Sequence, residues 1–186
     1  MTQANHPALE VGDLIVSRGN HSIGPITFQL SIGKQLALTG GNGIGKSSVL
    51  QAIAGLLPVT SGTIRISGES MLSGSDGVEP WRRGIAWLGQ ERGLWPHLSI
   101  EAQCRLVARD GGKTAEQIVA VARSLDMAEP IQRRPGALSG GEAQRAELLR
   151  TVCGGGALLL LDEPFAAQNQ DGRRRIEALL EQECQA

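Results

Sequence analysis

The alternation of apolar and polar positions predicts several strands in the first half of the chain. Residues 9–16 and 26–38 alternate or run apolar with many β-branched side chains, which is typical of strands. Residues 63–67 also alternate, and residues 85–89 form a short apolar run. The turn signals at 18–20 and at the pair Gly24-Pro25 predict breaks before the second strand, and the Gly-, Ser- and Asp-rich segment 68–84 predicts a loop.

Apolar positions at helical spacing predict helices elsewhere. Residues 46–57 place five aliphatic side chains on one face, and Pro58 ends that pattern. Residues 99–128 indicate a mostly helical region that is interrupted at 110–112, and Pro130 and Pro135 break the pattern after it. A final helix is predicted over 173–182, where three consecutive arginines are expected to form a solvated face.

Two helix starts and one buried strand are predicted more sharply. Thr114 with Gln117 has the spacing of a capping box, and Ser139 followed by Glu142 predicts the start of another amphipathic helix. Residues 157–161 are continuously apolar, as in a strand that both faces of a parallel sheet bury. Parallel strands that alternate with helices predict an α/β fold.

Composition narrows the class of protein. The length of 186 residues predicts one domain with a small inserted subdomain, and 20% charged with 41% hydrophobic residues is a globular composition. The net charge of −1 and the absence of Tyr argue against a nucleic-acid partner. The apolar runs are too short to span a bilayer, the N-terminus does not resemble a secretory signal, and three scattered cysteines favour a reducing compartment.

A glycine-rich loop between a predicted strand and a predicted helix has the pattern of a phosphate-binding loop, G-x-x-x-x-G-K-[ST]. Glycines let the backbone N–H groups point inward around an anion, and the helix N-terminus adds positive potential. Lys46 is predicted to reach the β- and γ-phosphates, and the Ser47 hydroxyl to bind Mg²⁺. The predicted nucleotide-binding residues here are Gly40, Gly41, Asn42, Gly43, Ile44, Gly45, Lys46, Ser47 and Ser48.

Two carboxylates follow the buried strand. Asp162 is placed to hold Mg²⁺, and Glu163 to polarise an attacking water, while Pro164 prevents the strand from continuing. Glu163 and Lys46 are therefore the predicted catalytic residues, and ATP with Mg²⁺ is the predicted cofactor set.

A third motif joins the other two through a resemblance. The segment 138–145, LSGGEAQR, resembles the LSGGQ signature of ATP-binding-cassette (ABC) ATPases, and the three motifs occur in that family's order. The resemblance implies a P-loop NTPase core with a RecA-like parallel sheet, an antiparallel β subdomain and a helical subdomain at about 92–137. It also implies that Gln90 contacts Mg²⁺ and the transporter's membrane subunit.

The resemblance further implies a mechanism and partners. In the family two cassettes face head to tail, so each ATP lies between one phosphate loop and the other cassette's signature, here Ser139, Gly140, Gly141 and Glu142. A homodimer is expected to drive a separate transmembrane permease, as a cytoplasmic subunit on the inner face of the cell membrane. The segment 91–100 is similar to that of importer cassettes of the molybdate, sulfate, iron or thiamine type.

The sequence departs from the family at three places. Asn169 stands where an aspartate is expected, and the region 9–27 offers no aromatic upstream of the loop, so Arg18 or His21 are the alternatives for stacking on adenine. The sequence stops at Ala186, before the family's last core strand and its histidine. We expect this to leave inner strand edges without partners. Either the acidic strand re-pairs, or another chain fills the gap, or the sequence is that of a truncated cassette that folds poorly.

Alternatives to an importer remain open at this point. The GNGIGKSS loop is also similar to that of haem-exporter cassettes of cytochrome c maturation. A nucleotide-binding module without useful hydrolysis is favoured by Asn169 and the missing histidine, and opposed by Lys46, Asp162 and Glu163. A soluble cassette of DNA repair or translation usually carries coiled-coil insertions or a second cassette, which this sequence lacks.

Overall fold

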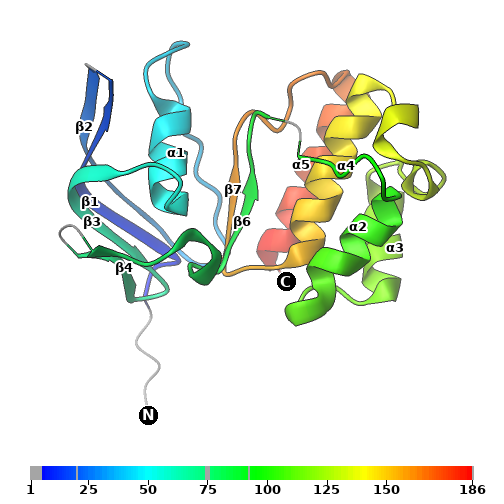
Figure 1. Ribbon diagram of the computed structural model, residues 1–186, viewed down its shortest axis with the longest axis horizontal. Coiled ribbons are helices and arrows are strands. Elements are labelled where there is room, and N and C mark those ends of the chain that lie inside the picture. Colours follow the sequence, from blue (N-terminus) through cyan, green and yellow to red (C-terminus); the bar gives the residue numbers. More distant parts are fainter. Residues whose placement is uncertain (1–5, 20, 74–75, 92, 186) are drawn as a thin grey trace. The chain divides into compact units, whose positions relative to one another are not determined.

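The computed structural model describes residues 6–19, 21–73, 76–91 and 93–185, which form two compact units. The first unit is residues 1–85 and the second is residues 86–186. Strand β6 (Ile85–Leu88) begins at the boundary and pairs within the second unit. Figure 1 shows the helices and strands of both units.

The first unit is built on an antiparallel sheet with the order β2-β1-β3-β4-β5. Its strands are β1 (Leu9–Arg18), β2 (His21–Leu30), β3 (Val59–Ile66), β4 (Glu69–Ser73) and β5 (Asp76–Gly77). The central strand β1 pairs Leu9 with Leu30 of β2 on one side and with Ile66 of β3 on the other. Alternation therefore predicted a sheet correctly in the first third of the chain.

A bulge resets the side-chain alternation in the middle of β1. Leu9 and Val11 are buried before it and Leu14 and Val16 after it, so the buried face moves from odd to even positions. Asp13 takes a left-handed φ of 45° at this point. Its backbone N–H donates to the Thr27 hydroxyl at 2.9 Å, and that hydroxyl donates to the Asp13 carboxylate at 3.0 Å. This local contact fixes the extra residue.

Two sequence predictions about the first sheet are wrong in detail. The pair Gly24-Pro25 does not break the chain before a strand, since both residues lie inside β2. An edge strand tolerates proline because its outward N–H needs no ladder partner. The segment 68–84 is not a single loop, because it contains β4, β5 and the 3-10 helix η1 (Pro80–Arg82). Cross-strand pairing with β3 overrides the loop-like composition there.

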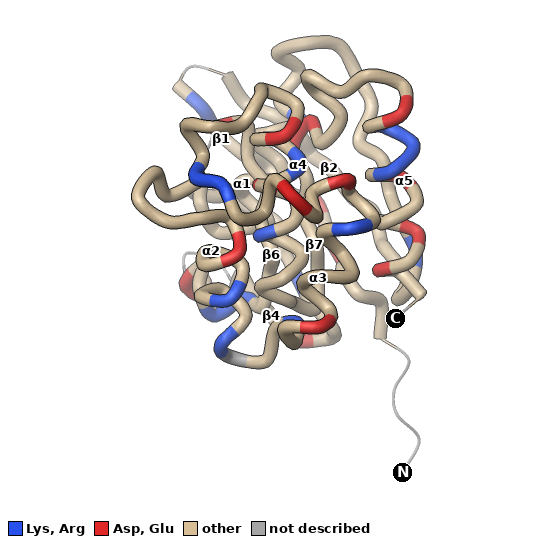
Figure 2. Tube along the Cα trace, turned by 90° about the vertical axis from the view of Figure 1, so that its right-hand side faces the viewer, with Lys and Arg blue, Asp and Glu red and all other residues tan. Residues whose placement is uncertain are grey.

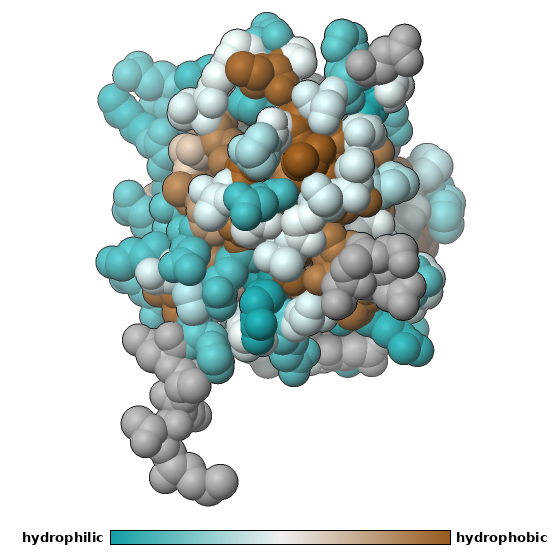
Figure 3. Space-filling view, turned by 90° about the vertical axis from the view of Figure 1, so that its left-hand side faces the viewer, coloured by the Kyte–Doolittle hydropathy of each residue, from teal (hydrophilic) through white to brown (hydrophobic). Residues whose placement is uncertain are grey.

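The strand predicted over 26–38 ends at Leu30. Residues 31–39, all of which are described, contain no strand, and the side chains of Ile32 and Leu36 are 67% and 48% exposed. Apolar patterning alone does not make a strand where a hydrogen-bonding neighbour is missing. Figure 3 looks onto the first unit and shows apolar surface between polar atoms.

Helix α1 (Lys46–Ala54) follows the glycine-rich loop and packs on β1. It is shorter than predicted because Gly55 adopts φ 79° and closes the helix with hydrogen bonds to Ala52 and Gln51. The buried guanidinium of Arg83 donates to the Ala52 and Ile53 carbonyls at 3.2 and 2.8 Å, and its Nε donates to Val78. One side chain therefore satisfies the carbonyl end of this helix.

The second unit joins a two-stranded sheet to four helices around one apolar core (Figure 1). Among the described residues its sheet contains β6 and β7 (Leu158–Leu161). Because the backbone N–H after β7, that of Asp162, donates to the carbonyl of Leu88 at 2.8 Å, the carboxyl ends lie together and the strands run parallel. The helices are α2 (Ile100–Val107), α3 (Ala115–Ser124), α4 (Gly140–Gly154) and α5 (Gln170–Gln185).

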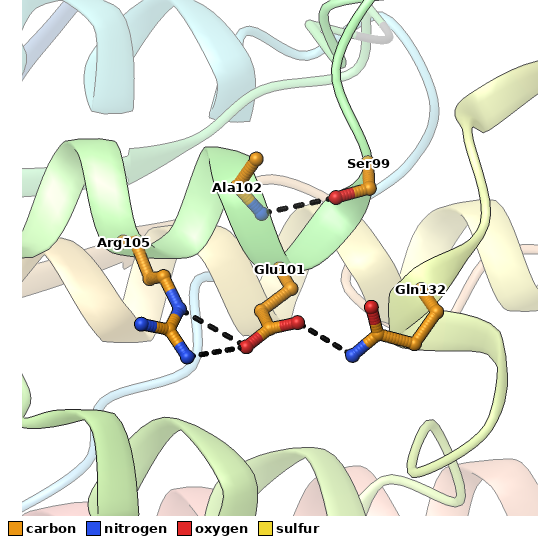
Figure 4. A network of polar contacts seen from close by, with 5 residues as sticks. All are labelled: Ser99, Glu101, Ala102, Arg105 and Gln132. Carbon is orange, nitrogen blue, oxygen red and sulfur yellow. Dashed lines mark hydrogen bonds and ion pairs between the residues drawn. The ribbon is translucent and has the colours of Figure 1, made fainter.

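The starts of α3 and α4 follow the sequence signals, whereas α5 extends three residues beyond each end of the predicted helix 173–182. The capping boxes at Thr114–Gln117 and Ser139–Glu142 are both formed. Short 3-10 helices, η2 (Ala108–Asp110), η3 (Pro130–Gln132) and η4 (Pro135–Ala137), stand where the helical pattern was interrupted. Glu101 on α2 accepts hydrogen bonds from Arg105 and from Gln132, which ties α2 to η3 (Figure 4).

Charge and apolarity are distributed without extremes. Acidic and basic residues are interspersed along the trace in Figure 2. Arg173, Arg174 and Arg175 are all exposed on α5, as the solvated-face prediction requires. Within the described residues, no helix has the length and apolarity needed to cross a membrane.

Candidate functional site

The glycine-rich loop of the first unit has the backbone that an anion-binding loop needs. Gly45 takes φ 107°, and a Cβ there would lie 2.5 Å from the Ile23 side chain of β2. Any other residue would be strained and would collide, so this position requires glycine. Gly43 also takes a left-handed φ, of 79°.

Lys46 and the start of α1 place positive charge at this loop. The Lys46 ammonium donates to the carbonyls of Gly40 at 3.0 Å and Gly41 at 2.9 Å, so it lies across the loop. Gly45 is the N-cap of α1, and among the described residues no side chain caps this helix and no acidic residue lies in its first turn. The helix dipole at the start of α1, with no acidic side chain in its first turn, favours an anion here. Ser47 is half-buried and Ser48 is buried in the same turn.

Both residues weighed for adenine stacking lie in the same unit. Arg18 and His21 pair across the β1–β2 hairpin, and both are exposed. Ile23, two residues further along β2, is the side chain that approaches Gly45. The hairpin therefore comes close to the glycine-rich loop, although stacking itself stays a prediction.

The second group of predicted residues gathers at the carboxyl ends of β6 and β7. Gln90 follows β6, and Asp162 and Glu163 follow β7. The Gln90 amide Nε2 donates to the Glu163 carboxylate Oε1 at 3.2 Å. Asp162 is 6% exposed. Parallel strand ends thus bring together three residues that are far apart in the sequence.

These residues line a cavity of about 310 Å³ in the second unit. The signature segment contributes Gly140 to its wall, and α4 also contributes Gln144 and Glu147. The sequence did not predict Gln144 and Glu147 as site residues. A period of three to four residues from Gly140 along α4 is the signal that places them on one helix face.

The turn after β7 is strained and is held by glutamines. Glu163 and Ala167 both take φ 53°, a conformation that costs a residue with a side chain about 1–3 kcal/mol. The Gln144 amide donates to the Glu163 carbonyl at 3.1 Å. The Gln168 amide donates to the Gly141 carbonyl and to the Gln144 oxygen, each at 3.1 Å. Contacts to α4 therefore hold the backbone of Glu163 in place.

Ser139 and Glu142 of the signature segment cap α4 within this chain. The Ser139 hydroxyl accepts from the Glu142 N–H at 3.3 Å, and the Glu142 carboxylate accepts from the Ser139 N–H at 2.7 Å. Hydrogen bonds from Ser139 lower the pKa of the Glu142 carboxyl. The resulting helix N-terminus lies beside the cavity through Gly140.

The departures from the family pattern have structural counterparts. Asn169, in place of aspartate, accepts the Gly172 N–H at 2.8 Å and so caps the start of α5.

Cys104 and Cys153 are buried against each other, and their hydrogen bond raises the pKa of the Cys104 thiol. Within the described part of the chain, no cluster of three or more metal-binding side chains is found.

The structure brings the predicted residues together in two groups, one in each unit. Gly40–Ser48 lie in the first unit, and Gln90, Ser139–Glu142, Asp162 and Glu163 lie in the second. A glycine loop before a helix, with carboxylates at parallel strand ends, defines the class of P-loop nucleotide-binding domains.

Comparison with known proteins identifies the family. The ABC transporter family model matches residues 23–166. The chain is 36% identical over 163 residues to the sn-glycerol-3-phosphate import ATP-binding protein UgpC of Escherichia coli (strain K12), covering 86% of this chain and 44% of UgpC. It is 35% identical over 167 residues to the thiamine import ATP-binding protein ThiQ of Shigella flexneri serotype 5b (strain 8401), covering 87% of this chain and 70% of ThiQ.

Solved structures agree with this assignment. The structure of an ATP-binding subunit of an ABC transporter matches with a TM-score of 0.81 and 25% identity, covering 96% of this chain and 75% of that one. A putative ABC transporter ATP-binding protein from Pyrococcus furiosus shares the fold, with a TM-score of 0.80, 24% identity, and coverage of 95% and 85%. The chain belongs to the ABC transporter family and is a nucleotide-binding domain of it. It spans less than half the length of UgpC.

Proposed function

We propose that this chain binds and hydrolyses ATP to power an ABC transporter of the importer type. The observation that carries the proposal is the meeting of Gln90, Asp162 and Glu163 in one cavity at the carboxyl ends of two parallel strands. An importer is favoured over a haem exporter because UgpC and ThiQ are import ATP-binding proteins.

The residues present suit a nucleotide with Mg²⁺. Lys46 and the uncapped start of α1 offer positive charge to phosphate oxygens. Each unit carries oxygen groups of the hard kind that Mg²⁺ prefers: the Ser47 hydroxyl in the first unit, and the Asp162 carboxylate and the Gln90 amide in the second. Mg²⁺ would neutralise phosphate charge, while Glu163 accepts the proton of the attacking water.

The partners follow from the family. We expect a second copy to supply Ser139, Gly140 and Gly141 across a head-to-tail dimer, where the N-terminus of α4 is suited to face an anion. We expect a separate transmembrane permease to dock on a helical subdomain at about 92–137, with the chain on the cytoplasmic face of the membrane. We expect no nucleic-acid partner, because a net charge of −1 provides no basic footprint for one.

The experiment that tests this proposal is ATP turnover by the purified chain beside the Glu163→Gln variant. Glu163→Gln keeps the size and one hydrogen-bonding oxygen but removes the base, which is expected to lower turnover by about 10²–10⁴-fold. Equal turnover in both proteins, with ATP bound, would contradict hydrolysis at this site. That result would favour a nucleotide-binding module without useful hydrolysis.

A further inference from the structure

The segment that follows Gln90 is held by two charged side chains of α4. The Gly93 N–H donates to the Glu147 carboxylate Oε1 at 2.7 Å. The Gly93 carbonyl accepts a hydrogen bond from the Arg150 guanidinium. Both polar groups of one backbone residue are therefore bound by side chains that stand three positions apart on one helix.

The burial of Glu147 shows that its carboxylate needs hydrogen-bonding partners. Its side chain is 5% exposed and stands between Ala146 and Leu148, which are both in the apolar core. A carboxylate in such a place loses hydration and is stable only when it is hydrogen-bonded. The Gly93 N–H supplies one such hydrogen bond, and the Arg150 guanidinium interacts with the same carboxylate electrostatically.

Arg150 is held in one orientation. Its guanidinium carbon lies 5.1 Å from the ring centre of Trp95, a cation–π distance. Burial lowers the pKa of Arg150, and the Glu147 charge opposes that shift. A Cβ on Gly93 would lie 3.0 Å from the guanidinium, which is a tight contact, so the small size of glycine favours this close approach.

A third buried side chain anchors the segment further along. Gln103 of α2 is fully buried, and its amide oxygen accepts the Trp95 N–H at 3.0 Å. Its amide nitrogen donates to the carbonyls of Trp95 at 2.9 Å and Leu98 at 3.1 Å. The loop between Gly93 and Leu98 is thus fastened by polar contacts at both ends.

The same Glu147 also lines the cavity that holds Gln90, Asp162 and Glu163. Gly93 is three residues from Gln90, and three residues reach at most about 10 Å. Fixing the backbone of Gly93 therefore restricts where the Gln90 amide can lie. The observed place of that amide is 3.2 Å from the Glu163 carboxylate.

We propose that Glu147 and Arg150 are positioning residues, which hold Gly93 and thereby keep Gln90 against Glu163. This inference rests on the proposed ATPase function and deepens it. Neither side chain takes part in the chemistry. They fix the main chain next to Gln90, whose side chain reaches Glu163. Because both residues stand on α4, they also connect the Gln90–Glu163 contact to the apolar core of the second unit.

The test compares three variants of the full chain: Glu147→Ala, Glu147→Gln and Val152→Ala. Val152→Ala is the matched control, since it is a buried core truncation on the same helix. We expect Glu147→Ala to lower kcat about 10-fold or more, as loss of a supporting contact usually does. ATP affinity is expected to stay within about two-fold, because Gly93 does not belong to the phosphate loop.

A second readout needs no turnover. The side-chain amide resonance of Gln90 reports its hydrogen bond to Glu163, and it is identified by its absence from Gln90→Leu. We expect this resonance to shift in Glu147→Ala and to return in Glu147→Gln, because the amide oxygen of glutamine still accepts the Gly93 N–H. Val152→Ala is expected to leave both the resonance and kcat near the wild-type values.

The outcomes separate the two proposals. An unshifted Gln90 resonance in Glu147→Ala, or a shifted resonance with unchanged kcat, would overturn the positioning role. Wild-type protein that does not hydrolyse ATP would overturn the proposed function, while the resonance would still decide whether Gly93 positions Gln90. If Glu147→Ala does not fold, Arg150→Met removes the contact to the Gly93 carbonyl and gives the same comparison.

Discussion

The two groups of site residues are organised in different ways. The phosphate loop is one continuous segment, and its conformation depends on glycines and on the start of α1 a residue later. The cavity of the second unit combines residues from after β6, from α4 and from after β7, and polar side chains hold them in place. A local motif can be recognised in the sequence, whereas a site formed by residues that are distant in the sequence depends on contacts that no motif predicts.

The first prediction tests whether the loop acts through its own charge. Lys46→Ala is expected to weaken ATP binding about 100-fold, because it removes charge-assisted hydrogen bonds to phosphate oxygens. Titration calorimetry with ATP measures the effect. Lys34→Ala is the matched control, since it removes an exposed lysine of the same unit outside the loop. Equal affinities in the two variants would show that Lys46 does not face the phosphates.

The second prediction concerns the far end of α1. Arg83→Met leaves the carbonyls of Ala52 and Ile53 unsatisfied, so the free energy of unfolding is expected to fall by about 2–3 kcal/mol. Urea denaturation measures it. The neighbouring Arg82 is exposed, and Arg82→Met is expected to change stability by less than about 0.5 kcal/mol. Similar losses in both variants would mean that Arg83 does not brace this helix.

The third prediction addresses the strained turn after β7. Gln168→Ala removes the contact to Gly141 and Gln144, and we expect kcat to fall about 10-fold as the Glu163 backbone loses support. The exposed Gln182→Ala on α5 is the control. Steady-state turnover at saturating ATP is the measurement, and an unchanged kcat would show that the turn holds itself.

The fourth prediction is the cap of α4. Ser139→Ala removes the acceptor for the Glu142 N–H and is expected to reduce the free energy of unfolding by about 1 kcal/mol. Chemical denaturation measures this loss. Thr114→Ala at the equivalent position of α3 gives the matched comparison. If Thr114→Ala lowers the free energy of unfolding and Ser139→Ala does not, the signature segment does not depend on its cap.

The smallest expected effect is a pH dependence at the same cap. The pKa of Glu142 is lowered in the folded state, so its contribution to stability is present above the ordinary glutamate pKa of about 4.3. That contribution is lost as the pH falls through the folded pKa. The difference in unfolding free energy between wild type and Glu142→Gln should therefore shrink on acidification. A difference that is constant down to about pH 3 would contradict this.

Most of the fold could be predicted because it follows local rules. The capping boxes, the proline breaks and the apolar run of β7 each act over a few residues. The segment 31–39 could not be predicted, since an apolar pattern does not reveal whether a neighbouring strand exists. The bulge at Asp13 could not be predicted for a similar reason, because it depends on the cross-strand partner Thr27.

The candidate site shows the same division. Lys46 and Asp162 belong to motifs with fixed spacing, so their positions were legible. Glu147 belongs to no motif, and Gln168 lies next to Asn169 without a predicted role of its own. Their roles appear when α4 packs beside the turns that follow β6 and β7. A glutamate or glutamine on a helix or in a turn has many possible partners, and the sequence alone does not show which one it contacts.

The most direct test of this account is the ATP affinity of Glu163→Gln, measured by titration calorimetry beside wild type and Lys46→Ala. If the loop binds the nucleotide and the cavity performs the hydrolysis, Glu163→Gln binds ATP within about three-fold of wild type while its turnover is lost. A loss of affinity as large as that of Lys46→Ala would contradict this division of roles.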